Sequence, residues 1–228
     1  NPEHKFQYFT EAPVLNSLIA LEGGHALPAE VIAGDQQAVS EVLRSLNVRY
    51  IMVHKPTAGA PLVEYVETVF PAEIIYEDSL YRLYRAEQAQ PAPAAVIYPY
   101  TGIGRLMLGE GWGQPNAGGT VWMESPQAHL LAPLPSGAVS LGLEVRAPIS
   151  QPLTIFLNDC RLGQGSAGPA WQELTVEAPA ACVRPGANDI LLKAVAPIPV
   201  DGSLTAAESR AVGRTGVISP VHITVHSA

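Results

Sequence analysis

Two of the three tryptophans in this sequence lie beside glycine-rich segments, where an aromatic ring can stay partly exposed. Trp112 lies within residues 109–113, and Trp122 follows a Gly-Gly-Thr segment. An exposed indole offers an apolar face and an N–H donor, the two features with which proteins commonly bind sugar rings. We therefore take both as candidate stacking platforms for a carbohydrate; the alternative is that all three tryptophans, Trp171 included, are core residues. The candidate hydrogen-bonding neighbours are Glu110, Asn116 and Glu124.

The motifs that would indicate catalysis are incomplete. Residues 163–168 satisfy the letters of the dinucleotide motif G-x-G-x-x-G, but Pro169 and a strand-like run follow, so no helix can receive a pyrophosphate, and we expect a turn. His54 and Asp78 could meet at a strand end, but the sequence places no nucleophile beside them. We expect no catalytic residue, no metal ligand and no cofactor.

The two cysteines, Cys160 and Cys182, allow two interpretations. They could be buried thiols. They could also form a disulfide, which requires an oxidising compartment and would stabilise the fold by about 3 kcal/mol in the chain-entropy model.

Composition excludes some classes of function. Apolar residues make up 47% of the 228 residues and charged residues 15%, so the chain can bury a core. A net charge of −8 without a Lys/Arg cluster argues against nucleic acid as a partner. No segment approaches the roughly 20 apolar residues of a membrane-spanning helix. The sequence begins Asn-Pro-Glu without a methionine, and we expect the natural start of the product to lie upstream.

The first part of the chain predicts a small α/β domain. Apolar residues at i, i+3, i+4 and i+7 predict an amphipathic helix over 35–46, with Asp35 as its N-cap. A buried strand, a second helix and the two strands of a hairpin are expected at 48–54, 61–70, 73–76 and 80–85.

A stretch rich in Gln, Ala and Pro, residues 86–95, has the composition of a linker, and we divide the chain there into domains 1–90 and 91–228. Beyond it, short strand-like runs separated by Gly/Pro-rich turns predict an antiparallel β-sandwich of the jelly-roll, galactose-binding-like kind, with a short helix at 204–211. Strands are expected at 105–108, 120–123, 128–131, 138–146, 153–157, 172–177, 189–196 and 221–226.

Several short stretches resemble a known family. They are similar to the extracytoplasmic region that follows the last membrane helix in bacterial polytopic glycosyltransferases of the protein-mannosyltransferase and arabinosyltransferase type, and to the sandwich appended to some of those proteins. In the first domain the similar stretches are Gln-Tyr-Phe-Thr at 7–10, Leu-Arg-Ser-Leu-Asn-Val-Arg-Tyr-Ile-Met-Val-His at 43–54, and residues 75–85. In the second they are 109–112, 120–122 and 153–158.

The resemblance implies an accessory role. In that family the lipid-linked sugar donor and the catalytic acid belong to loops among the membrane helices, and nothing in this sequence matches those loops. It therefore implies a non-catalytic domain on the extracytoplasmic face of the cell membrane, which supports or binds a glycan or lipid-linked sugar beside the transmembrane part of its own parent protein. The alternatives are a structural or protein-interaction module without sugar binding and, less favoured, a free-standing hydrolase.

Overall fold

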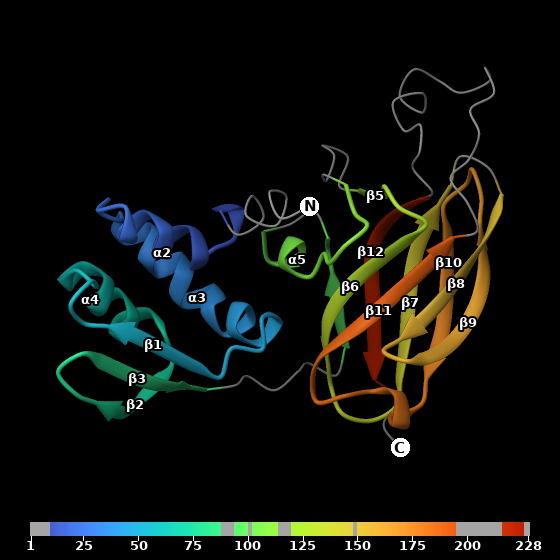
Figure 1. Cartoon of the computed structure of the whole chain (residues 1–228). Helices are drawn as coiled ribbons and strands as arrows, with labels where there is room; N and C mark the ends of the chain where they lie inside the picture. Colours follow the sequence, from blue (N-terminus) through green and yellow to red (C-terminus); the bar gives the residue numbers. More distant parts are fainter. Residues whose placement is uncertain are drawn as a thin grey trace. The chain divides into compact units, whose positions relative to one another are not determined.

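The chain divides into two compact units, Asn1–Gln90 and Pro91–Ala228, in the computed structural model shown in Figure 1. The structure describes residues 10–87, 94–99, 102–113, 120–147, 150–194 and 216–225. Among these residues, no helix is both long enough and apolar enough to cross a membrane.

In the first unit, helices pack on one face of a three-stranded antiparallel sheet (Figure 1). Its core is formed by Val53, Val66 and Tyr84, against which Leu18 and Ile51 pack. The strand order is β1-β3-β2, so β1 and β2 are the two edge strands. The elements are α2 (Leu15–Glu22), α3 (Ala29–Ser45), β1 (Tyr50–His54), α4 (Ala60–Val69), β2 (Ala72–Glu77) and β3 (Tyr81–Ala86).

The prediction that Asp35 is a helix N-cap is wrong. Helix α3 already begins at Ala29, and Asp35 lies inside it with only 3% of its surface exposed. Its carboxylate accepts hydrogen bonds from the Val14 N–H at 2.8 Å, the Ser17 hydroxyl at 2.5 Å and the Tyr65 hydroxyl at 2.6 Å. A buried carboxylate needs such donors to offset its lost hydration. Since Val14 immediately precedes α2, Asp35 caps the neighbouring helix instead of its own.

The backbone at Val14 explains why this cap is needed. Val14 has φ 67° and ψ −53°, and the Leu15 N–H donates to the Pro13 carbonyl at 2.7 Å, which is the geometry of a γ-turn. A β-branched residue adopts this conformation only under tertiary constraint, because its side chain crowds the backbone. The hydrogen bond from Val14 to Asp35 supplies that constraint.

We expect Tyr65→Phe to lower the free energy of unfolding of the first unit by about 1–3 kcal/mol, because buried Asp35 loses a donor. Burial, reinforced by the hydrogen bond to Asp35, raises the pKa of Tyr65 above its ordinary value. A tyrosine whose pKa is higher in the folded than in the unfolded protein stabilises the fold fully at pH values below its unfolded pKa of about 10. This stabilisation is lost as the pH rises beyond that value. Denaturation followed by circular dichroism at 222 nm should therefore show a shallower loss of stability above pH 10 in Tyr65→Phe. Parallel losses in both chains would mean that Tyr65 is not the group that titrates.

The second unit is an antiparallel β-sandwich with two packed sheets (Figure 1). One sheet has the order β10-β7-β12-β4, with β5 also paired to β12; the other has the order β6-β11-β8-β9. Leu141 and Leu143 of β7 and Ile190 and Leu192 of β11 are fully buried in a core that excludes solvent. The strands are β4 (Ala94–Ile97), β5 (Val121–Met123), β6 (Gln127–Leu134), β7 (Val139–Arg146), β8 (Gln151–Leu157), β9 (Cys160–Ala167), β10 (Gln172–Ala178), β11 (Gly186–Ala194) and β12 (Gly216–Val225), with short helices α5 (Gly102–Leu106) and η1 (Ala180–Cys182).

Two local predictions for the sandwich are wrong. Residues 105–108 do not form a strand: α5 occupies 102–106, and only Leu108 forms an isolated bridge, with Leu130. The expected turn at 163–168 lies almost entirely within β9. A Cβ atom at Gly165 would lie 2.6 Å from a methyl carbon of Leu174, so glycine lets β9 pack closely against β10. The helix expected at 204–211 lies outside the described residues.

Candidate functional site

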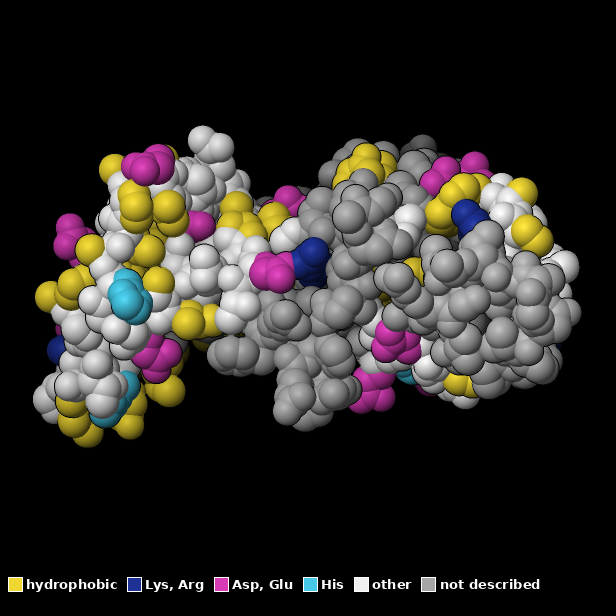
Figure 2. Space-filling view, turned by 90° about the horizontal axis from the view of Figure 1, so that it is seen from above, with side chains coloured by type: hydrophobic (Ala, Val, Ile, Leu, Met, Phe, Trp, Pro, Cys, Tyr) yellow, Lys and Arg dark blue, Asp and Glu magenta, His cyan; other side chains and the backbone are white. Residues whose placement is uncertain are grey.

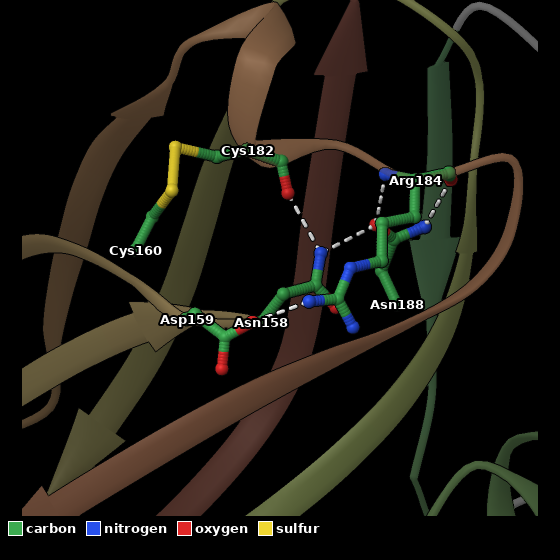
Figure 3. Close-up of a disulfide and its surroundings, with 6 residues drawn as sticks. All are labelled: Asn158, Asp159, Cys160, Cys182, Arg184 and Asn188. Carbon is green, nitrogen blue, oxygen red and sulfur yellow. Dashed lines mark hydrogen bonds and ion pairs between the residues drawn. A yellow bond between two sulfur atoms is a disulfide. The ribbon is translucent and has the colours of Figure 1, made fainter.

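One end of the sandwich is held by a disulfide between Cys160 and Cys182, with an S–S distance of 2.12 Å (Figure 3). Cys160 begins β9, and Cys182 ends η1 in the connection from β10 to β11. The bond therefore ties the β8–β9 hairpin to the β10–β11 connection. The β8–β9 hairpin belongs to one sheet, and the β10–β11 connection runs from the other sheet into β11, which pairs with β8. The disulfide therefore links the hairpin to the segment that crosses between the two sheets at this end.

A hydrogen-bond network surrounds the disulfide (Figure 3). The Asn158 side-chain amide donates to the Cys182 carbonyl at 2.7 Å and to Oδ1 of Asn188 at 2.9 Å. Asn188 is fully buried; its Oδ1 also accepts from the Arg184 N–H, and its Nδ2 donates to the carbonyls of Arg184 and Gly186. Because the buried amide groups satisfy one another, this end of the sandwich has a structural role.

Trp112 is a core residue, and the prediction that it is a stacking platform is wrong. Only 6% of its surface is exposed, and its indole Nε1 donates to the His129 carbonyl at 2.6 Å. The glycines around it serve close approach: the Gly109 N–H donates to the same carbonyl at 2.8 Å, and a Cβ at Gly111 would lie 1.9 Å from the Gln127 carbonyl oxygen. Residues 107–113 therefore run along the edge of β6 and carry Trp112 inward.

The structure describes three of the four other residues of the predicted sugar site. Val121 and Met123 point into the core, so Trp122 between them lies on the outward face and is half-buried. Glu124, which follows β5, is exposed, and Glu110 is exposed in the segment beside β6. Asn116 lies outside the described residues.

A second outward-facing tryptophan lies in the same cross-strand row as Trp122. Val217 of β12 pairs with Trp122 on one side and with Arg146 of β7 on the other. Cross-strand partners project to the same face, so Arg146 also points outward. Trp171 directly precedes Gln172, the partner of Val145, so continued alternation places Trp171 beside Arg146, and 44% of its surface is exposed. We call Trp122, Arg146 and Trp171 the tryptophan row.

Carboxylates lie next to the tryptophan row. Glu144 of β7 and Glu173 of β10 are direct cross-strand partners two residues further along the strands, and both point outward. The row lies at the end of β10 opposite to the disulfide, since Trp171 precedes that strand and Cys182 follows it (Figure 1). The face thus combines two indoles, a guanidinium and two carboxylates.

Sequence reasoning missed Trp171 and Arg146. The clean alternation of 139–146 was the signal for Arg146, because Leu143 and Val145 inside require Arg146 outside. The same alternation extended backwards from Leu174, which pairs with Leu143, would have placed Trp171 outside.

The outward face of the other sheet is occupied by its own pairs. The Lys193 ammonium lies 5.0 Å from the centre of the Phe156 ring, and His129 Nδ1 lies 2.9 Å from Oδ2 of Asp189. The Phe156 ring is therefore already covered by a cation. Within the described ranges, no group of three or more His, Cys, Asp or Glu side chains could hold a metal ion.

Comparisons with known proteins give a structural likeness alone. No protein-family model and no curated protein matches this sequence. One similar solved structure is a GH26-CBM35 β-(1,4)-mannanase from Podospora anserina, with a TM-score of 0.40, 11% identity, and coverage of 59% of this chain and 28% of that one. The C-terminal CBM6 of a laminarinase from Zobellia galactanivorans has a TM-score of 0.37 and 14% identity over 57% of this chain and 98% of that one. The CBM36-1 domain of a xylanase from the hindgut metagenome of Trinervitermes trinervoides also has a TM-score of 0.37, with 12% identity over 59% and 99%.

Proposed function

We propose that this chain is a non-catalytic, carbohydrate-binding part of a membrane glycosyltransferase, and that it contacts a glycan acceptor or product on the extracytoplasmic side of the membrane. The observation that carries the proposal is the tryptophan row. Two indole faces supply apolar stacking surfaces, while Arg146 and the neighbouring Glu144 and Glu173 supply hydrogen-bond donors and acceptors for hydroxyl groups. Stacking plus a few placed polar groups is the chemistry of sugar recognition.

The spacing of the row favours a chain of sugars over a single one. Trp122 and Trp171 are separated by β12 and β7, so three strand spacings of about 4.8 Å place their backbones about 14 Å apart. One sugar ring cannot lie against both indoles at that separation. The ligand that uses the whole row is therefore an oligosaccharide.

The compartment and the parent protein are supported by other features. A disulfide persists in oxidising surroundings, which supports an extracytoplasmic position. The stretches at 43–54 and 75–85, whose sequence resembles the membrane glycosyltransferases, form the end of α3, the whole of β1, the second half of β2 and most of β3 of the first unit. In this proposal the first unit adjoins the transmembrane part of the parent.

A glycan array probed with the whole chain tests the carbohydrate proposal. We expect oligosaccharides of three or more units, mannosides and arabinosides among them, to bind above background, monosaccharides to bind far more weakly, and bound oligosaccharides to be recovered uncleaved. An array without any binder would contradict sugar binding, and released reducing sugar would indicate a hydrolase.

The size and location of the native product test the membrane proposal. An antibody raised against this chain should detect, in fractionated native cells, a membrane-bound species much larger than 24.1 kDa. A soluble species of about that mass would contradict the glycosyltransferase parent and leave a free binding module.

A further inference from the structure

Strand β1 presents an open edge. It lies at the end of the β1-β3-β2 order, and among the described residues it pairs with β3 alone. The Lys55 N–H donates to the Leu80 carbonyl and the Ala86 N–H to the Arg49 carbonyl. These bonds show which residues along β1 direct their backbone groups toward β3. In an antiparallel pair the alternate residues then turn their backbone groups away from the partner. The N–H and C=O groups of Tyr50 and Met52 therefore point away from β3.

A groove runs along this open edge. It has a volume of about 310 Å³ and is lined by four consecutive residues of β1, Ile51 to His54, as well as by residues of α2 and α4. Consecutive strand residues line one cavity only where the cavity follows the strand edge, since their side chains alternate between faces. Leu18, Leu21, Leu62 and Val66 make the opposite wall apolar, and Glu22 contributes a carboxylate.

A second cavity adjoins the groove. Leu21 and Gly59 line both, and the second, of about 470 Å³, extends between the α2–α3 connection and α4. Its lining includes Leu27 and Ile32, with Glu64 as a second carboxylate. Together the two cavities form a path for a chain longer than a few residues.

We propose that this groove binds an extended segment of a partner protein, which joins the first unit as a strand beside β1. The unpaired N–H and C=O groups recur every second residue, about 6.8 Å apart, a pattern that an extended peptide matches and that a sugar or a lipid does not. Alternate side chains of the segment enter the apolar part of the groove. This function is independent of sugar binding by the sandwich.

Charge indicates that the segment is basic. Residues 1–90 contain 6 Lys/Arg and 12 Asp/Glu, a net charge of −6. Four of the cations are paired: Arg82 and Lys55 with Glu77, whose pKa they hold below its ordinary value, Arg85 with Glu73, and Arg44 with Glu41. On the face seen in Figure 2, hydrophobic side chains of the first unit lie among acidic ones, with little Lys or Arg visible. Lys or Arg in the bound segment would complement Glu22 and Glu64.

The other edge of the sheet is less suited to this role. The register of β2 against β3 shifts between Ile74 and Tyr76, whereas the register of β1 is regular from Tyr50 to His54. Such a bulge twists an edge and weakens its capacity to pair with another strand.

A peptide display library tests the proposal. Random ten-residue peptides are selected against the whole chain, and an enriched peptide is then measured by fluorescence anisotropy. We expect sequences with apolar residues at alternate positions and Lys or Arg between them. Met52→Pro removes an N–H that does not serve the β1–β3 ladder, so it should fold and yet bind the peptide at least tenfold more weakly. Met52→Ala, the matched control, removes the same side chain from the groove but keeps the N–H, so it should lose much less affinity than Met52→Pro.

Two further measurements hold even if Met52→Pro does not fold. Glu22→Lys, at an exposed position, should weaken the same basic peptide several-fold, and hydrogen exchange at the Tyr50 and Met52 amides should slow when peptide is bound. A library without enriched sequences, unchanged affinity in both Met52→Pro and Glu22→Lys, or equal losses in Met52→Pro and Met52→Ala would overturn the proposal. Dimerisation of the chain that Met52→Pro abolishes would also overturn it, because the occupant would then be a second copy.

Discussion

Replacing Trp171 by alanine should weaken oligosaccharide binding at least tenfold, and Trp122→Ala should do the same. A sugar stacked on an indole covers on the order of 60–100 Å² of apolar surface, which at about 25 cal/mol/Å² contributes about 1.5–2.5 kcal/mol. Each 1.4 kcal/mol corresponds to a tenfold change in affinity. Isothermal titration calorimetry with the tightest trisaccharide from the array would measure the loss. The double variant should bind below detection.

The chain offers a matched control for this prediction. Phe156→Leu removes a half-buried aromatic ring from the outward face of the other sheet and should leave sugar affinity unchanged. Unfolding curves would confirm that each variant is folded. Full affinity in both tryptophan variants, together with a loss in Phe156→Leu, would contradict the tryptophan row as the sugar site. It would indicate instead a sugar site on the sheet β6-β11-β8-β9.

The order of elements in the first unit could be read from the sequence, because each element there has a strong local pattern. Helices near 35–46 and 61–70, a strand at 48–54 and a hairpin after it are all present as α3, α4, β1 and the pair β2–β3. The prediction that the strand at 48–54 is buried is wrong, because β1 is an edge strand with Tyr50 and Met52 exposed. Helix α2 could not be read in the same way. It begins at a strained Val14, and the group that holds that backbone is Asp35, which lies 21 positions later. The start of α2 is thus encoded by a long-range contact.

In the sandwich, the role of the glycines beside Trp112 also depends on a contact that is distant in the sequence. The alternation along residues 140–146 puts Leu141, Leu143 and Val145 on one face, and all three are buried. Glycine beside Trp112 predicted exposure, but the same residue type also permits close approach of two backbones, and the structure uses Gly109 and Gly111 for that purpose. Only the presence of β6 next to them distinguishes the two cases, and strand adjacency is not a local property.

Removing the disulfide should have the largest effect on stability. The double variant Cys160→Ser, Cys182→Ser should lower the free energy of unfolding of the sandwich by about 3 kcal/mol, because the 22-position cross-link restricts the unfolded chain. All three tryptophans lie beyond residue 91, so their fluorescence during denaturation reports the second unit alone.

Reduction provides an independent comparison for the disulfide. The unchanged chain treated with dithiothreitol should become as unstable as the double serine variant, since both lose the same cross-link. Arg184→Gln, which breaks only an exposed ion pair with Asp159, should change stability by less than about 1 kcal/mol. If reduction did not change the unfolding curve, the cross-link would not be what stabilises this end of the sandwich. The support that the disulfide gives to an oxidising compartment would then be lost. If stability falls as expected, the result would support the proposed extracytoplasmic position, in which an oligosaccharide reaches the tryptophan row at the opposite end of the sandwich.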